Sequence, residues 1–516
     1  MKAPALSLLV LTALSPLAGA SATTPAPATI AYSIDLNRRA DDLFHVTLRV
    51  TGLGPENAIY QFAATAPGTY QVMNIGRYVK SFAAYDAKGV RVPVEQVSVN
   101  QWRLSAPARV RTIRYTVGET WDSPLDHPIY KMCGTSIEAD HVLINPHAVI
   151  GYLAGMQAAP VRLRLAYPAA WTAGTALHRG PDGVYVAESY DQLVDSPILL
   201  GRLSKARVVV TGVPIDVYAY SATGKIKASQ LLGAMSGMLT AAGRFLGRLP
   251  VDRYTFLYHF AEAPAGAWEH SFSSEYVLQE SEFTDSVGHR VTDIAAHEFF
   301  HIVTPLNIHS EIIEHFNFVT PVPSRHLWLY EGTTEWAAHA MQLRAGLKTP
   351  EDYLQTQIRK MQIDRQAYDS SYSLGELSLT SYSDSGQKQY ANIYMRGALT
   401  AGLLDIRLLE LSHGDRGLQD LITELTHRFG KRRAFPDSTF VDTLVAMTSP
   451  EIRDFFDRYV WDSQHLPIKE YYAKLGITLV EDEKGLPVRF EIDPNPTDEQ
   501  RLLREAWLGR KPQGAT

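Results

Sequence analysis

Short runs in the first half of the chain alternate apolar and polar residues. Examples are HVTLRV (45–50), VRTIRYTV (110–117) and VRLRLAY (161–167), and turn-forming pairs such as Pro67-Gly68 separate such runs. A period of two, broken by turns, is typical of half-buried strands. The pattern predicts an N-terminal β-sandwich-like domain over residues 30–212.

The spacing of apolar residues changes near residue 223. KIKASQLLGAMSGMLTAAGRFLG (225–247), VTDIAAHEFFHIV (291–303) and YEGTTEWAAHAMQLRA (330–345) have helical spacing, and the second should stop before Pro305. Residues from about 350 to 475 are mostly helical in pattern. We therefore expect a multidomain α+β chain, with a mixed domain over 213–348, a helical C-terminal domain over 349–480 and a tail over 481–516.

Composition and charge narrow the function classes. The chain has 516 residues, 45% hydrophobic and 20% charged, and a formal net charge of −6. Without a basic excess, a dedicated nucleic-acid binder is not expected, so nucleic acid is not a predicted partner. The single cysteine, Cys133, excludes an intramolecular disulfide framework and a cysteine-based zinc site.

Residues 1–22 have the features of a cleaved secretory signal peptide. Lys2 supplies a positive start, residues 5–18 are mostly apolar, and small residues allow cleavage after Ala20 or Ala22. A retained anchor helix is the alternative, which Pro16 and the short apolar run disfavour. No later stretch approaches ~18 apolar residues, so we expect a periplasmic or secreted protein with no membrane span after signal cleavage.

The motif HEFFH (297–301) carries the clearest chemistry. On a helix, His297 and His301 are four residues apart and leave the same face, where two imidazoles can hold Zn²⁺. Glu298 lies beside them as a candidate general base. The alternative is a pair of core or surface histidines without a metal. The apolar residues that flank the motif indicate a buried helix, which favours the metal-site interpretation.

A catalytic zinc usually takes a third protein ligand and leaves one position for water. By position, Glu331 in HLWLYEGTTEW is the best candidate, although an acid at a helix start can simply stabilise the helix dipole. Glu335, one turn later, suits a hydrogen bond from a ligand imidazole. Four histidines remain as competing ligands: His309, His315, His326 and His339.

These motifs resemble the glycyl aminopeptidase family of zinc metallopeptidases, distant relatives of the aminopeptidase N type. That family follows H-E-x-x-H with a W-x-x-E-G-x-T motif, and this chain has WLYEGTT (328–334), with Glu331 thirty positions after His301. The resemblance implies one zinc ion per chain, held by His297, His301 and Glu331, with Glu298 activating the zinc-bound water. It also implies that the central domain is thermolysin-like.

Two further motifs extend the resemblance. GAWEH, from Gly266 to His270, is similar to the family's G-G-x-E-H substrate-binding motif, which implies that Glu269 binds the free α-amino group of the substrate. IYMRGAL (393–399) is similar to the Y-x-K-G-A-L segment, which implies that Tyr394 stabilises the oxyanion. The structural alternatives are an edge-strand turn with an exposed acid and a core tyrosine.

The resemblance covers about residues 30–480, including APGTYQVMNIGRYVKSF (66–82), and there are departures. IVTPLNIHSE (302–311) replaces the family's W-N-V-K-R, Arg396 replaces a lysine, and residues 481–516 are too few for the PDZ domain of many relatives. These differences leave the preferred N-terminal residue open.

The sequence therefore predicts a secreted zinc metallo-aminopeptidase that removes N-terminal residues from peptide substrates. A zinc endopeptidase is the alternative if Glu269 does not reach the cleft, and a zinc hydrolase of non-peptide substrates rests on fold analogy. A non-catalytic secreted binding protein on a peptidase fold is the alternative from another class. The sequence carries no signal for the oligomeric state.

Overall fold

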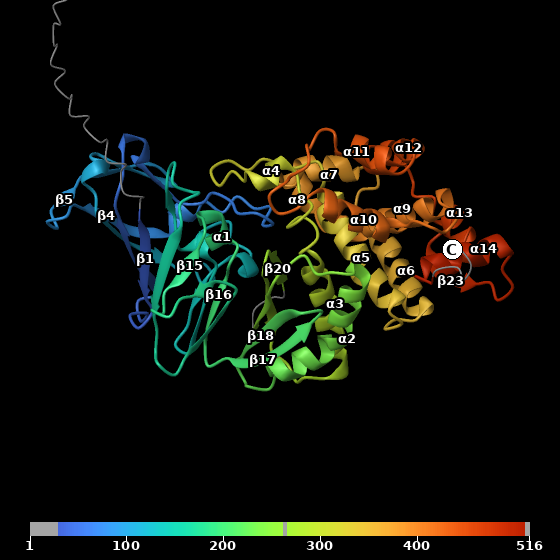
Figure 1. Ribbon diagram of the computed structural model, residues 1–516, viewed down its shortest axis with the longest axis horizontal. Helices are drawn as coiled ribbons and strands as arrows, with labels where there is room; N and C mark the ends of the chain where they lie inside the picture. The colour runs from blue at the N-terminus through green and yellow to red at the C-terminus, as the bar shows by residue number, and fades with distance from the viewer. Residues whose placement is uncertain (1–28, 262–265, 511–516) are drawn as a thin grey trace, which may run out of the picture.

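The computed structural model describes residues 29–261 and 266–510. The predicted signal peptide, residues 1–22, lies outside the described residues. Figure 1 shows a β-rich domain at one end, a mixed domain in the middle and helices at the other end, which confirms the multidomain α+β fold. Within the described ranges, no helix is both long and apolar enough to cross a bilayer.

Strands of the N-terminal domain form one large sheet and two small ones. In β2 (Leu43–Val50) every second side chain is buried, as the alternating pattern predicts. The large sheet has the order β14 (His178–Arg179), β15 (Tyr185–Ala187), β12 (Val161–Ala166), β1 (Ile30–Asp35), β2, β8 (Thr112–Gly118), β4 (Val79–Tyr85), β5 (Arg91–Val92). The small sheets are β13 (Thr172–Thr175), β16 (Ile198–Gly201), β10 (His141–Ile144), β9 (Ser136–Ile137), and β11 (Tyr152–Leu153), β3 (Ile59–Gln61), β7 (Gln101–Leu104), β6 (Val94–Ser98).

Short helical segments connect these strands, and most of them are single turns. They are η1 (Pro55–Asn57), η2 (Ile75–Tyr78), η3 (Pro107–Arg109), η4 (Lys131–Cys133), η5 (Pro146–Ala148) and α1 (Tyr190–Val194).

The central domain is built on a five-stranded sheet. Its order is β17 (Ser204–Val210), β18 (Val213–Ser221), β19 (Tyr254–Ala261), β21 (Ser273–Gln279), β20 (Gly266–His270), and the two edge strands, β17 and β20, are each antiparallel to their neighbour. Because β17 pairs with β18 along its whole length, this sheet starts before residue 213, where the sequence places the domain boundary. Helices α2 (Ala228–Leu246) and α3 (Asp285–Phe300) pack together in the same core.

Helix α3 carries the HEFFH motif in its last turn. The Thr284 side chain caps its start by accepting a hydrogen bond from the Val287 N–H, and His301 follows the last helical residue. The buried face of α3 includes Val291, Ala295 and Phe299, at helical spacing. The burial of this face fixes the side of the helix from which the histidines project.

After α3 the chain continues as a series of helices through the rest of the central domain and the helical domain. They are α4 (Glu311–Glu314), the π-helix η6 (Trp328–Thr333), α5 (Thr334–Arg344), α6 (Pro350–Ala367), α7 (Leu374–Thr380), α8 (Asp384–Gln389), the π-helix η7 (Ile393–Gly397), α9 (Ala398–Leu411), α10 (Leu418–Arg428), α11 (Phe440–Met447), α12 (Ile452–Phe456), the π-helix η8 (Asp457–Trp461) and α13 (Ile468–Ala473). The predicted helix over 330–345 is thus a π-helical turn followed by an α-helix.

The described residues after 480, which the sequence assigns to a tail, are folded. Strands β22 (Ile477–Glu481) and β23 (Pro487–Ile492) form a hairpin, so a boundary at 480/481 falls inside β22. Helix α14 (Asp498–Trp507) packs on α9 and buries Leu503 and Trp507. This segment therefore completes the core of the helical domain.

Candidate metal and peptide-binding site

A cavity of about 340 Å³ opens where the three domains meet. The central domain contributes residues of β20, α3 and η6, and the other two domains complete the walls. Its lining includes Gly68, Tyr70, Tyr130, Met132, Trp268, Glu269, His297, Glu298, His301, Glu331, Gln387, Tyr390 and Tyr394. The chain therefore gathers side chains more than 300 residues apart around the HEFFH helix.

Three of the predicted ligands converge in this cavity. The Nε2 atoms of His297 and His301 lie 3.3 and 3.5 Å from Oε2 of Glu331. The ligand atoms of the three residues are all within 4.8 Å of one another, and all three residues are buried. Two imidazole nitrogens and one carboxylate oxygen are a donor set that zinc favours.

The other ring nitrogen of each histidine is held by the protein. Nδ1 of His297 donates to Glu335 at 2.7 Å, and Nδ1 of His301 donates to the carbonyl of Thr304 at 2.8 Å. These bonds leave both Nε2 atoms turned toward Glu331, as a metal site requires. Burial would lower the pKa of His297, but Glu331 and Glu335 raise it well above its ordinary value.

Glu335 is the centre of a buried network of charged groups. It accepts hydrogen bonds from Lys360 and from His339, in addition to His297. Burial opposes ionisation of Glu335, yet Lys360 and the hydrogen bonds hold its pKa well below the ordinary value. An ionised Glu335 can orient His297, which is the role that the sequence predicts for it.

The four competing histidines do not join the cluster of candidate ligands. His339 bonds Glu335, His326 bonds the Asp437 carbonyl, and the side chain of His315 is 80% exposed. His309 is buried, but it is not part of the groups of potential metal ligands found in the described residues.

Glu298 and Glu269 lie close together beside the candidate metal ligands. A carboxylate oxygen of each lies within 4.8 Å of the other and of a His301 ring nitrogen. Burial raises the pKa of Glu298 to about 8, with the neighbouring Glu331 carboxylate adding to the rise. Burial and the charge of Glu331 also raise the pKa of Glu269 well above its ordinary value. A cation between these carboxylates would relieve their mutual repulsion.

The predicted substrate-binding residues of the GAWEH motif lie on strand β20, and not all of them reach the cavity. Glu269 lines the cavity, whereas Gly266 and His270 do not. The buried His270 ring instead lies 3.5 Å from Asp195, and Gly266 lies against Met132. Successive residues of a strand point to opposite faces, so a motif read on β20 cannot bring all its side chains into one cleft. Of the three predicted residues, only Glu269 lines the cavity, together with Ala267 and Trp268 of the same strand.

Tyr394 approaches the cluster from the helical domain. Its ring centroid lies 5.4 Å from that of His297, and burial together with the charge of Glu331 raises its pKa well above the ordinary value. The phenol therefore stays protonated and can donate a hydrogen bond. This geometry fits a donor to a developing oxyanion.

Sequence reasoning missed the closure of the cleft by the N-terminal domain. Gln387 Nε2 donates to the Tyr70 carbonyl at 2.8 Å, and Gln387 Oε1 accepts from the Tyr130 hydroxyl at 3.0 Å. Tyr70 adopts a positive φ of 46°, which is uncommon for a non-glycine residue. The resemblance of segment 66–82 to the family indicated that this segment has a function. No local sequence pattern, however, links it to Gln387.

Comparisons with known proteins agree with this arrangement. Residues 31–202 match the peptidase M61 N-terminal domain, and residues 290–400 match the M61 glycyl aminopeptidase domain. No curated protein matches the chain significantly.

Several solved structures share the fold. An aminopeptidase N family protein from Idiomarina loihiensis is 21% identical with a TM-score of 0.78, over 91% of this chain and 82% of that one. Native yeast LTA4 hydrolase is 12% identical with a TM-score of 0.53, over 87% and 70%. Its complex with bestatin is 13% identical with a TM-score of 0.53, over 85% and 68%. From the two matched domains and the motifs inside them, the chain belongs to the M61 family of glycyl aminopeptidases.

Proposed function

We propose that this metallopeptidase is a secreted or periplasmic zinc aminopeptidase that releases N-terminal residues from peptides. The observation that carries the proposal is the convergence of His297, His301 and Glu331, with Glu298 and Glu269 beside them. Secretion rests on the signal-like pattern of residues 1–22.

The residues present fit a zinc ion. The three donors come from two helical segments, their outer hydrogen bonds fix both imidazoles, and three protein ligands are the usual number for a catalytic zinc. When bound, zinc would lower the pKa of a coordinated water and polarise the scissile carbonyl.

Glu298 is placed to move the proton. Its carboxylate takes a proton from the attacking water and gives it to the leaving amine. Burial in the cavity disfavours the charged carboxylate, which promotes acceptance of that proton. The Tyr394 hydroxyl donates a hydrogen bond to the oxygen on which negative charge develops.

Glu269 sets the position of the substrate. Its carboxylate pairs with the N-terminal ammonium, since a buried acid beside two other carboxylates favours a cation. An internal peptide bond brings no such cation and leaves the acid unpaired. Gly68 and Tyr70 line the same cavity from the N-terminal domain. These features favour an aminopeptidase over an endopeptidase.

The test combines metal content with hydrolysis of aminoacyl-p-nitroanilides. Glu298→Gln should retain one zinc per chain and lose about 10²–10⁴-fold in rate, because it removes the general base. Glu282→Gln, which alters an exposed carboxylate paired with Lys225, is the matched control and should keep the wild-type rate. Near-normal hydrolysis by Glu298→Gln would overturn the assignment.

A further inference from the structure

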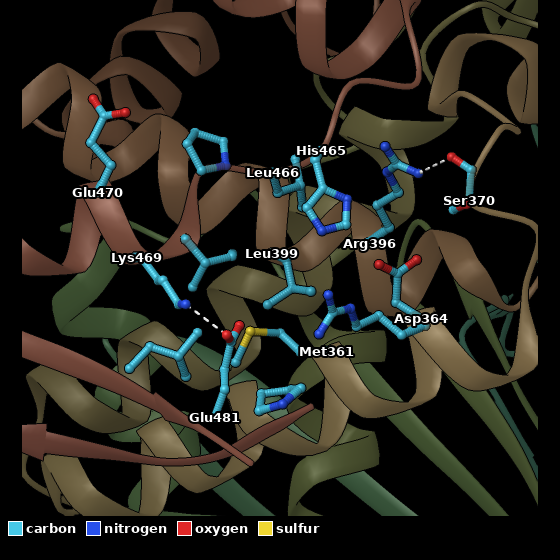
Figure 2. Close-up of a pocket in the computed structure, with 15 residues that line it drawn as sticks. Met361, Asp364, Ser370, Arg396, Leu399, His465, Leu466, Lys469, Glu470 and Glu481 are labelled. Carbon is cyan, nitrogen blue, oxygen red and sulfur yellow. Dashed lines mark hydrogen bonds and ion pairs between the residues drawn. The ribbon is translucent and has the colours of Figure 1, made fainter. Parts of the chain in front are cut away.

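A second cavity, of about 390 Å³, lies within the helical domain (Figure 2). It is bounded by α6, α9, α13 and the β22–β23 hairpin, and it shares no lining residue with the cavity around the HEFFH helix. Its volume is in the range of small-molecule sites. The proposed hydrolysis makes no use of it.

Arg396, at one end of this cavity, is a buried cation that forms no direct ion pair within the described residues. The residue is 3% exposed and donates from Nη1 to the Ser370 carbonyl at 3.1 Å and from Nη2 to the Gln464 carbonyl at 3.0 Å. Among the residues that the structure describes, its Nε has no hydrogen-bond partner. Over residues 29–261 and 266–510, no carboxylate oxygen lies within 4.0 Å of its guanidinium. A buried charge left unpaired in this way is costly.

Asp364 lies at the same end of the cavity as Arg396, as Figure 2 shows. It accepts a hydrogen bond from Asn392 Nδ2 at 2.9 Å and, within the described part of the chain, forms no ion pair. An unpaired cation and an unpaired anion therefore face the same space without touching each other.

Apart from the exposed Arg365, which donates to the Gly485 carbonyl, the wall between the two ends is mainly apolar. Met361 and Leu399 lie between this end and the far end, where Lys469 and Glu481 neutralise each other at 2.6 Å. A simple anion would meet Asp364, and a simple cation would meet Arg396. A ligand with a carboxylate and an ammonium at one end and an apolar group at the other would match Arg396, Asp364 and the apolar wall.

We propose that this cavity binds a free α-amino acid with an apolar side chain. Its carboxylate pairs with Arg396, its ammonium with Asp364, and its side chain covers Leu399 and Met361. The proposal rests on the proposed function in one respect, because free amino acids are the product of that reaction. Binding itself needs no catalysis, so the two proposals can fail separately.

The experiment measures binding of L-leucine by calorimetry to the zinc-loaded Glu269→Gln protein. This substitution removes the carboxylate that pairs with the substrate's ammonium group in the catalytic cleft. Binding of L-leucine as a reaction product in that cleft is therefore suppressed. One L-leucine should bind per chain. Leucinamide lacks the carboxylate and N-acetyl-L-leucine lacks the ammonium, so each should bind about tenfold more weakly or worse. Absence of L-leucine binding in this background overturns the proposal.

Asp364→Asn, added to the same background, separates the two charges. The amide keeps the shape of Asp364 and can still accept from Asn392, so folding should be preserved. L-leucine should lose about tenfold in affinity, whereas N-acetyl-L-leucine should lose none. Glu470→Gln is the matched control, since Glu470 is an exposed carboxylate of the same lining that Figure 2 shows on the opposite side from Asp364. Unchanged L-leucine affinity in Asp364→Asn would place the ligand elsewhere.

Arg396→Lys gives an independent check of the carboxylate end. Lysine keeps the charge but not the forked donor geometry, so L-leucine should bind less tightly while leucinamide binds as before. An equal loss for both ligands would contradict a carboxylate contact at this residue.

Discussion

Gly332 and Gly397 pack backbone against backbone where the π-helices η6 and η7 meet. A Cβ on Gly332 would lie 2.8 Å from the Cα of Gly397, and one on Gly397 would lie 2.9 Å from the Cα of Gly332. Glu331 immediately precedes one glycine, and Tyr394 lies in the same turn as the other. This close approach holds the third candidate ligand and the candidate oxyanion donor on one wall of the cavity.

Gly332→Ala should therefore damage the site more than the fold. The new methyl group has to push the two turns apart, because it meets backbone atoms that no side-chain rotation can move. We expect loss of about tenfold or more in zinc affinity together with reduced kcat/KM. Gly233→Ala, in an open position of helix α2, is the control and should stabilise by about 0.4–1 kcal/mol. Equal zinc affinity in both variants would contradict the account.

Gly68→Ala should weaken binding of free N-termini. Gly68 has φ +76°, and a Cβ there would lie 2.6 Å from both Glu269 Oε1 and Trp268 Nε1. Gly89 has a similar φ of +77°, but a Cβ built there would have no described atom within 4 Å. Gly89→Ala therefore introduces the same backbone strain as Gly68→Ala without a steric clash. Both variants should lose roughly 1 kcal/mol of stability. Only Gly68→Ala should raise KM for unblocked substrates, and a matching rise in Gly89→Ala would count against a role for Glu269.

Glu335→Gln should reduce zinc affinity about 10–100-fold, because the hydrogen-bond acceptor that orients His297 loses its charge. It also leaves the buried Lys360 without its carboxylate partner, so the Tm should fall. Asp293→Asn is the control, since Asp293 pairs with Lys348 further out in the same network and is 41% exposed. Competition with a chelator measures the affinity, and equal affinities in the two variants would remove Glu335 from the metal site.

Asp195→Asn should change how stability depends on pH. Burial would raise the pKa of Asp195, but hydrogen bonds from His270 and the Ser271 N–H lower it overall. The pKa of Asp195 is therefore lower in the folded protein than in the unfolded chain, where an aspartate has a pKa of about 3.9. Such an acid stabilises the folded protein at pH values above about 3.9. This stabilisation is lost as the pH falls through the pKa of the folded state. The variant should be less stable than wild type at pH 7, and the difference should shrink below about pH 4. Denaturant titrations of both proteins at a series of pH values measure the difference in stability. A difference that stays the same at every pH would contradict this prediction.

Local patterns predicted the parts of this molecule that depend on local geometry. The helix around His297 and His301 follows from spacing, and the alternating strands follow from period two. Glu331 needed the motif resemblance, because nothing in its own helix sets the distance to α3. Contacts such as that between Gln387 and Tyr70 depend on how domains meet, which no local pattern records. The β17–β18 hairpin is local, but the sheet that it joins is set by the pairing of β18 with β19, which lies further along the chain.

The most direct test of the account compares each aminoacyl substrate with its N-acetylated twin. The zinc-loaded wild-type protein should hydrolyse the free form about 10²-fold faster or more, since the blocked form leaves the buried Glu269 without its cation. Glu269→Gln should lose most of that preference while it keeps its zinc. Equal hydrolysis of free and acetylated substrates by the wild-type protein would contradict the aminopeptidase assignment.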